Sequence, residues 1–531
     1  MTRTGKKLLT GTLLLALTLP VSALAADQDV NQKIDALQKE LDALKKKTEQ
    51  VEQKTDQVER KSLGRWLEIG GDYRFRYDYL NGSVANFYNP TFNASGQVNG
   101  FNFNPAFDVK NDSLFTNRFG LNLKAKATKD VTVTARLLMY KVSGEQDDAA
   151  VNGTGGSGVG PFFADRAGLF DGTIGHVPGD SRLAVDRVYA TWNNIADQPI
   201  WFSVGRRPST GGVPSELRDN REKPGNSGVP ALLVDYAFDG VTLGYAPDID
   251  ALPGSYLKLC YGRGFENGIT TDSGNGLRDT DMFGINVVPY DTDAFRAEFQ
   301  YNRGMNIFNV PVFVTGPNLN TPFASPSVNV GDIDWFGLDF LGKVKNVGIG
   351  HINWFVDGAL SVTRPNNNTV ILPVDPAAFG GATSAPFAGL LYNPQTETRK
   401  DKTGWAIYLG GRYDIEDTGT KLGVEYNHGS KDWITFAPAA DDMWTSKVGT
   451  RGNVYEGYVI QELKLKPISS YTSKVFFRVG YQYYDFDYTG SNNWIGAPVK
   501  ISELALSPLN AQMLTPLKTA QNVYATFEVH F

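Results

Sequence analysis

The chain has 531 residues, a formal net charge of −6 and an aromatic content of 12%. The acidic balance excludes binding to nucleic acid through overall charge, and the single cysteine, Cys260, excludes a framework of disulfides. The length alone fits either several soluble domains or one large barrel with long loops.

The first element along the chain is an apolar run at residues 8–24, which follows three basic residues and ends in Ala-Leu-Ala. A basic start, an apolar centre and a small-residue cleavage site predict a signal peptide over residues 1–25. An uncleaved anchor helix is the alternative, but the run is shorter than the ~20 residues that a spanning helix needs. We therefore expect an exported protein.

The second element is a helical stretch at residues 26–63 with a heptad pattern. Apolar or β-branched residues recur in alternating steps of four and three, and nearly all residues between them are charged or amide side chains. The predicted seam consists of Val30, Ile34, Leu37, Leu41, Leu44, Thr48, Val51, Thr55 and Val58. One helix cannot bury this stripe alone, so we predict a periplasmic coiled coil that forms a homo-oligomer, most simply a trimer. A lone solvated helix, or a contact with the cell wall or a periplasmic partner, stays open.

The third element, residues 64–531, has an apolar period of two. Tyr73, Phe75 and Tyr77, for example, alternate with Arg74 and Arg76. The alternation recurs in segments of about ten residues, which is typical of strands with one face toward lipid and the other toward a lumen. The pattern predicts an all-β fold, a transmembrane antiparallel β-barrel.

The links between these segments alternate strictly between long and short, eight long and seven short, and so separate sixteen strands. Bacterial outer-membrane barrels have short periplasmic turns and long outer loops. We predict about sixteen strands, within a range of 14 to 18, because Asp239-Gly240 within residues 231–246 could form an additional hairpin turn.

The end of the last segment alternates apolar residues up to a terminal aromatic residue: Val523, Ala525, Phe527, Val529 and Phe531. This pattern resembles the C-terminal signature of Gram-negative outer-membrane proteins, which the barrel assembly machinery recognises. The resemblance implies that Phe527, Val529 and Phe531 form an assembly signal. It also implies a location in the cell outer membrane, in contact with its lipid and lipopolysaccharide.

Two further segments, residues 186–192 and 201–208, resemble the paired strands of general porins, in which an Arg-x-Tyr strand is followed by a Gly-Arg strand. The predicted signal peptide, coiled coil and barrel together resemble uncharacterised porin-like outer-membrane proteins of metal-reducing bacteria that carry an N-terminal coiled coil. The resemblance covers the whole chain but implies no particular substrate.

A barrel of sixteen strands is too wide for its side chains to fill and leaves an aqueous channel. We therefore predict passive diffusion of small hydrophilic solutes or ions. The predicted pore-lining residues are Arg74, Arg76, Arg118, Arg136, Arg187, Arg207, Arg296, Glu298, Asp339, Arg412, Asp414 and Arg478. Acidic and basic lumen residues are nearly equal in number, so total charge does not set the ion preference. The alternative to a role in the pore is that each of these residues simply pairs with a residue on a neighbouring strand. A long link that folds into the bore should form the constriction. We favour residues 142–184 over residues 361–400 for this role.

Catalysis is not expected. The four histidines, His176, His351, His428 and His530, show no metal-ligand spacing, and no nucleophile motif follows a strand. We predict no cofactor and no metal site, since acidic clusters such as residues 145–148 are more simply solvated loop charge than calcium ligands. The alternative function is a scaffold or sheath that carries an electron-transfer or other partner protein across the outer membrane. A barrel that encloses a folded partner needs more strands than we count in this chain.

Overall fold

The computed structural model describes residues 66–144, 181–225, 228–272, 276–309, 327–437, 442–466 and 473–531, and the single residues 41, 45, 47, 176 and 178. The chain divides into two units, Met1–Trp66 and Leu67–Phe531. The predicted signal peptide and the coiled-coil seam, apart from Leu41, lie outside the described residues and stay predictions. Within the described part of the chain, no helix is long and apolar enough to cross a membrane.

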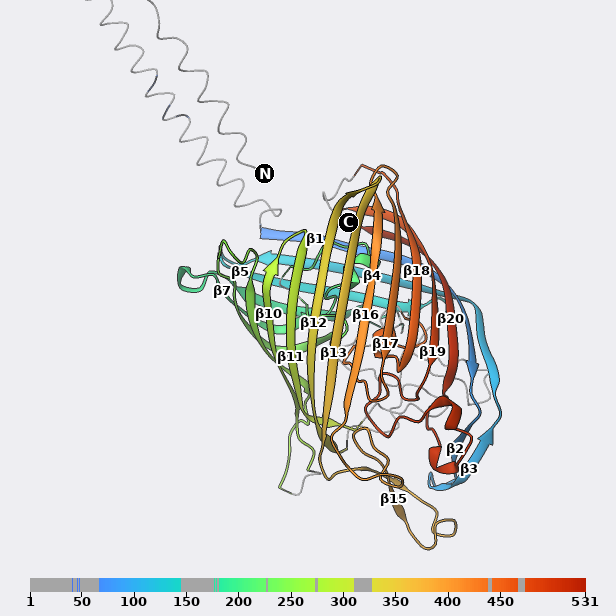
Figure 1. Cartoon of the computed structure of the whole chain (residues 1–531). Helices are drawn as coiled ribbons and strands as arrows, with labels where there is room; N and C mark the ends of the chain where they lie inside the picture. Colours follow the sequence, from blue (N-terminus) through green and yellow to red (C-terminus); the bar gives the residue numbers. More distant parts are fainter. Residues whose placement is uncertain are drawn as a thin grey trace, which may run out of the picture. The chain divides into compact units, whose positions relative to one another are not determined.

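The second unit is a closed antiparallel barrel of sixteen strands (Figure 1). In chain order the barrel strands are β1 (Leu67–Val84), β4 (Phe107–Lys126), β5 (Val131–Val142), β6 (Ala184–Trp192), β7 (Ile200–Ser209), β8 (Tyr236–Tyr245), β9 (Tyr256–Phe265), β10 (Thr280–Asp291), β11 (Phe295–Phe308), β12 (Asn329–Val347), β13 (Gly350–Pro365), β16 (Thr403–Ile415), β17 (Thr420–Gly429), β18 (Gly452–Glu462), β19 (Lys474–Phe486) and β20 (Leu517–His530). The predicted fold class and strand number are confirmed. Asp239-Gly240 lies inside β8, so the additional hairpin is wrong.

Outward and inward side chains differ in polarity, as the alternation predicts. In β16, Trp405, Ile407 and Leu409 are exposed, whereas Tyr408 and, further along the same strand, Arg412 are buried. Successive side chains of a strand point to opposite faces, so the apolar set forms the outer surface of the barrel. Such a surface suits a lipid environment.

The barrel closes where β1 pairs with β20. Phe531 N donates to Gly71 O at 2.9 Å, and Gly71 N donates to Phe531 O at 2.8 Å. The ring centroids of Phe527 and Phe477 are 5.1 Å apart. The predicted assembly-signal residues therefore belong to the closing strand or directly follow it, and their recognition during assembly stays a prediction.

The long links carry the remaining described elements. Two hairpins lie outside the barrel sheet, β2 (Phe87–Phe92) with β3 (Val98–Asn104) and β14 (Val370–Pro373) with β15 (Ser384–Ala388). The short helices are η4 (Ile195–Asp197), α3 (Ser215–Arg218), η5 (Lys447–Gly449), η6 (Ile501–Glu503) and η7 (Pro508–Asn510). All except η4 belong to long links.

Part of the interior is an apolar core that two long links build against the wall. Leu233 and Trp433, from the links after β7 and after β17, are fully buried in one cluster with Trp335 of β12. The two links also pair with each other, since Phe436 N donates to Leu233 O at 2.9 Å. Trp335 Nε1 donates to Ile434 O at 2.9 Å. Loops thus fill space that the strands of so wide a barrel leave empty.

Candidate functional site

The link between β7 and β8, residues 210–235, folds into the barrel; we call it the inward loop. Its two arms touch near the wall, where Ala231 N donates to Val213 O at 2.9 Å. A Cβ atom added to Gly212 would lie 1.6 Å from Val229 O, so only glycine allows this approach. The arms therefore leave the wall as a closed neck, with the α3 tip beyond it.

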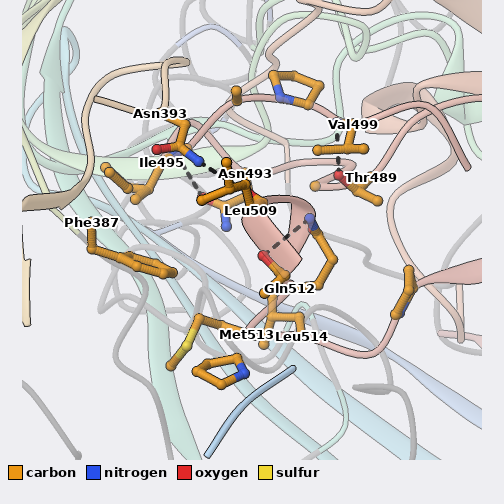
Figure 2. A pocket seen from close by; sticks show the side chains of 18 of the residues that line it. Phe387, Asn393, Thr489, Asn493, Ile495, Val499, Leu509, Gln512, Met513 and Leu514 are labelled. Atoms are coloured by element: carbon orange, nitrogen blue, oxygen red, sulfur yellow. Dashed lines mark hydrogen bonds between the residues drawn. The ribbon is translucent and has the colours of Figure 1, made fainter. Parts of the chain in front are cut away.

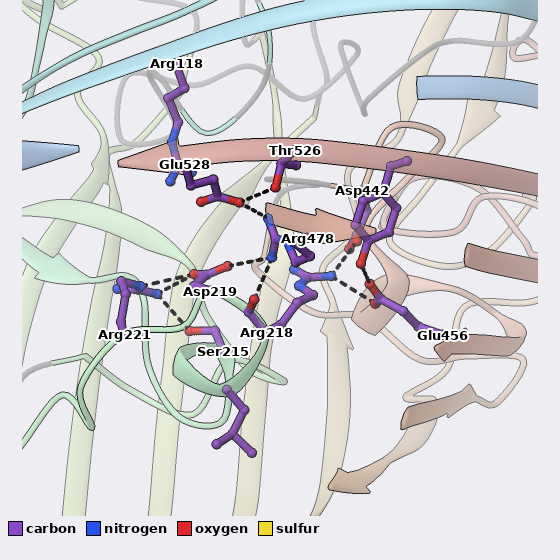
Figure 3. Close-up of polar contacts among 12 residues, drawn as sticks. Arg118, Ser215, Arg218, Asp219, Arg221, Asp442, Glu456, Arg478, Thr526 and Glu528 are labelled. Atoms are coloured by element: carbon purple, nitrogen blue, oxygen red, sulfur yellow. Dashed lines mark hydrogen bonds and ion pairs between the residues drawn. The ribbon is translucent and has the colours of Figure 1, made fainter. Parts of the chain in front are cut away.

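The tip of the inward loop reaches the opposite wall. Counted from β1, the loop starts from the fifth and sixth barrel strands, and it docks on the thirteenth and fourteenth, β17 and β18, half a circumference away. Arg218 Nη1 donates to Glu456 Oε2 of β18 at 3.2 Å (Figure 3). Lys421 Nζ of β17 donates to Asn220 Oδ1 at 2.6 Å. The loop thus crosses the whole bore.

Basic side chains of the wall hold the backbone of the inward loop. Arg478 Nη1 donates to Arg218 O at 2.7 Å, Arg296 Nη1 to Gly225 O at 2.9 Å, and Lys258 Nζ to Gly228 O at 2.7 Å. Arg412 Nη1 donates to Leu217 O in the same way. Hydrogen bonds from charged donors are stronger than neutral ones, so these contacts fix the path of the loop from several strands.

A buried charge network joins the tip to the link after β17. Arg218 Nη1 donates to Asp442 Oδ1 at 2.9 Å as well as to Glu456, and Lys447 Nζ lies 2.6 Å from Glu456 Oε2. Lys447 also pairs with Glu425. Burial alone would lower the pKa of Arg218, but Glu456 and Asp442 outweigh it and raise the pKa. Arg218 therefore stays charged. Its removal would leave Asp442 without an ion pair among the described residues and Glu456 with Lys447 as its remaining cation.

Three of the predicted arginines gather on the wall formed by β4, β5 and β6. Arg136 Nη2 lies 2.6 Å from Asp72 Oδ1, Arg118 Nη2 lies 3.6 Å from Asp72 Oδ2, and Arg187 Nε lies 3.0 Å from Asp186 Oδ2. Each arginine thus has an acidic neighbour on the wall, as the pairing alternative requires.

The inward loop adds one more basic residue, Arg221, whose Nη2 atom lies 2.6 Å from Asp219 Oδ2. Burial opposes the charge, but Asp219 and, more weakly, Glu216 and Asp72 raise the pKa of Arg221. The influence of Asp72 shows that this part of the loop lies within electrostatic reach of the β1 wall. Arg118, Arg221 and Asp219 can be followed in Figure 3.

The basic member is the more exposed in the pairs of Arg118, Arg187 and Arg221, whereas Arg136 is slightly less exposed than Asp72. The side chain of Arg221 is 38% exposed against 18% for Asp219, and that of Arg187 is 26% exposed against 2% for Asp186. The charge that water reaches on this side of the described structure is therefore mainly positive.

The other predicted pore-lining residues are mostly engaged in buried contacts. Arg76 Nη2 lies 2.7 Å from Asp78, and Arg74 lies over the ring of Tyr140 at 5.3 Å from its centroid. Arg207 Nη2 donates to Tyr261 O at 3.2 Å. These three arginines are nearly inaccessible to solvent, so a contact with a passing solute stays a prediction for each of them.

The remaining predicted residues lie under or beside the inward loop. Arg296 Nη2 is 2.6 Å from Glu298, Arg412 Nε is 2.6 Å from Asp414, and Arg478 Nη2 is 2.8 Å from Glu528. Asp339 faces Asp357 in the register of β12 and β13. The structure thus joins Arg296, Arg412 and Arg478 to the loop, a role that the alternation did not predict.

The inward loop itself was not among the predicted constriction loops. The favoured link, residues 142–184, lies mostly outside the described residues, and residues 361–400 contain the β14–β15 hairpin instead. One described residue of the favoured link, His176, lies 3.0 Å from Asp186 and 3.1 Å from Asp235 at the end of the inward loop. The sequence did contain a signal for the inward loop, because residues 216–223 include six charged residues between Gly211-Gly212 and Pro224-Gly225.

The docking of the inward loop should depend on pH through Glu216, a buried residue of α3 whose Oε2 atom has no hydrogen-bond partner among the described residues. Burial, reinforced by Asp339, raises the pKa of Glu216 from its usual value of 4.5 to about 7. A raised acidic pKa favours the protonated form, so the docked loop loses stability as pH rises from about 4.5 through 7. We expect the Glu216→Gln variant to show a smaller fall in thermal unfolding temperature between pH 5 and pH 8 than the parent protein.

The matched control is Glu222→Gln in the same loop, because the Glu222 side chain is 75% exposed. This variant should keep the pH dependence of the parent protein. An unchanged pH dependence in Glu216→Gln would show that Glu216 does not titrate in this range.

Comparison with known proteins gives a family and a set of similar structures. The family model described as "Protein of unknown function (DUF3373)" matches residues 108–531. No curated protein sequence matches the chain. Similar solved structures include OmpT, an outer membrane protein of Vibrio cholerae, with 12% identity and a TM-score of 0.37, covering 88% of this chain and 97% of that chain. The anion-selective porin from Comamonas acidovorans has 10% identity and a TM-score of 0.38, covering 88% and 99%. Salmonella typhi OmpF has 11% identity and a TM-score of 0.35, covering 87% and 97%.

Proposed function

The chain belongs to the family of proteins of unknown function DUF3373, and from its geometry we propose that it is a porin-like channel of the outer membrane. It allows the passive diffusion of small hydrophilic solutes or ions. The inward loop narrows the bore, and passage follows the polar side between this loop and the wall of β1, β4, β5 and β6.

The observation that carries the proposal is the docking of the inward loop on the wall opposite its origin. The contacts of Arg218 with Glu456 and of Lys421 with Asn220 fix the loop across the bore. On one side the space is packed with apolar side chains such as Leu233 and Trp433. On the other side the loop faces partly exposed arginines. A wide barrel with a fixed internal constriction is suited to selective diffusion.

A sheath for a partner protein is the second candidate function, and the same observation weighs against it. A folded partner would need an unobstructed bore of nearly the full barrel width. The neck at Gly212, the tip at Arg218 and the apolar core around Trp433 occupy that width. We therefore favour a channel over a scaffold.

The accessible arginines support a preference for anions. Rings of one charge sign in a constriction select ions of the opposite sign. Arg118, Arg187 and Arg221 are each more exposed than the acidic residue beside them. The proposal is therefore a channel with a mild preference for small anions.

The test is to record the conductance of the purified full chain in planar bilayers under a potassium chloride gradient. We expect stepwise conductance and a reversal potential with the sign of an anion preference. Replacing Arg187 with Gln should shift the reversal potential toward cation preference, because a partly exposed positive charge next to Asp186 is removed. Lys110→Gln is the matched control, since it removes the same charge from a side chain that is 64% exposed and paired with Asp112.

Inserted, folded and silent protein would contradict the channel. A cation preference in the parent protein would contradict the role of the arginines but leave the channel itself in place.

A further inference from the structure

The long links outside the bore are joined into a ring by backbone contacts. Val98 of β3 forms a bridge with Val374 next to β14, and Leu390 forms a bridge with Ile495 in the link after β19. Gln512 N of that link donates to Tyr88 O of β2 at 2.8 Å. Backbone contacts therefore join three links from distant parts of the sequence.

This ring encloses a cavity of about 350 Å³ (Figure 2). Its apolar lining includes Phe101, Phe387, Ile495, Leu509, Met513 and Leu514. Phe101 and Leu509 stay exposed although the backbone around them is hydrogen-bonded. Small-molecule sites are preformed cavities of this size with a mostly apolar lining and a few placed polar groups, and the mouth of a barrel is a common location.

Arg451, whose side chain is buried, is one of the polar residues that line the cavity. Its Nε donates to Trp433 O at 3.0 Å, Nη1 to Thr489 O at 3.0 Å and Nη2 to Asn493 O at 2.6 Å. A guanidinium carries five N–H groups, so these bonds leave two N–H groups for a further acceptor.

The charge of Arg451 has no close counter-charge. Within the described residues Arg451 forms no ion pair, and Asp432 is the acidic group that acts on it from a distance. Burial lowers the pKa of Arg451 to about 10, which still leaves the side chain charged at neutral pH. A buried charge is costly unless it is paired, and a bound anion would supply the missing partner.

We propose that this cavity is a binding site for a compact ligand with an apolar, preferably aromatic, body and one carboxylate or similar anionic group. The apolar body would contact Phe387, Leu509 and Met513, and the anion would accept hydrogen bonds from Arg451. Arginine suits this role because its planar fork matches a carboxylate. The site is separate from the inward loop and does not depend on the passage of solutes through the bore.

The test is isothermal titration of the full chain in lipid nanodiscs with naphthalene-2-carboxylate, with empty nanodiscs as the blank. The uncharged analogue naphthalene-2-carboxamide tests whether binding requires the negative charge of the ligand. We expect the carboxylate to bind at least about tenfold more tightly than the amide, because only the anion compensates the buried cation. Comparable affinities for the two compounds would overturn the role of Arg451.

Substitutions test whether the ligand binds in this cavity. Ala497 lines the cavity, so the Ala497→Phe variant should fill it and weaken naphthalene-2-carboxylate binding at least about tenfold. Ala505→Phe is the matched control, with the same change in the same link at a residue that does not line the cavity, and it should bind like the parent protein. Arg451→Lys should keep the preference for the carboxylate, and Arg451→Gln should abolish it. Equal binding to Ala497→Phe and the parent protein would overturn the proposal, even if the Arg451 variants fail to fold.

Discussion

Excision of the tip of the inward loop is expected to raise the single-channel conductance several-fold. The structure indicates the points of excision, because Val213 and Ala231 are hydrogen-bonded at the neck and can be joined by a short turn in place of residues 214–230. An Asn-Gly turn suits such a tight antiparallel connection. The variant keeps Leu232 and Leu233, so the apolar core against Trp433 is retained. Conductance should rise because the cross-section of the bore is no longer divided.

The control for this experiment is the integrity of the barrel, measured by far-ultraviolet circular dichroism and thermal unfolding, which should still show a folded β-protein. Unchanged conductance of a folded variant would contradict the role of the loop as the constriction. If the parent protein is silent and the excised variant conducts, the inward loop is a plug, and the proposal of an open channel is wrong.

The second large effect is expected from Arg218→Ala. The substitution removes the cation that Asp442 and Glu456 share, and both carboxylates are almost fully buried. Breaking a buried ion pair by removing one partner costs about 3–5 kcal/mol, and here the cost falls on the docked state of the loop. We expect a lower thermal unfolding temperature and a conductance that fluctuates between levels as the tip leaves the β17–β18 wall.

Arg221→Ala is the matched control for Arg218→Ala. Arg221 lies three positions further along the same loop, but it pairs with Asp219 and Ser215 of its own loop. Its loss should leave the unfolding temperature and the current noise close to those of the parent protein, and should only shift the ion preference toward cations. Identical behaviour of the two variants would show that the contact with Glu456 does not hold the loop.

The barrel could be predicted from the sequence because its signal is local. Phe75 points outward and Arg74 and Arg76 point inward for the same reason that they alternate in the chain, since successive residues of a strand face opposite sides. The strand number followed from the alternation of link lengths, and only the Asp239-Gly240 hairpin had to be rejected.

The candidate site could be predicted only in part. The arginines of the wall, such as Arg136 and Arg187, were found by their place in the alternation. The inward loop was missed because its partners are remote: Arg218 contacts Asp442 and Glu456 across sequence separations of 224 and 238 residues. No periodicity of either segment encodes that contact.

The sequence by itself determined the class of fold, the face that each strand residue takes and the alternation of long and short links, because all three depend on neighbouring residues and on the geometry of a strand. The tertiary structure decided which link enters the bore, which buried charges compensate one another and where a cavity remains among the loops. These features arise only after closure of the barrel has placed β17 and β18 opposite β7 and β8. Only then can the inward loop dock on a wall that is formed by strands from a distant part of the chain.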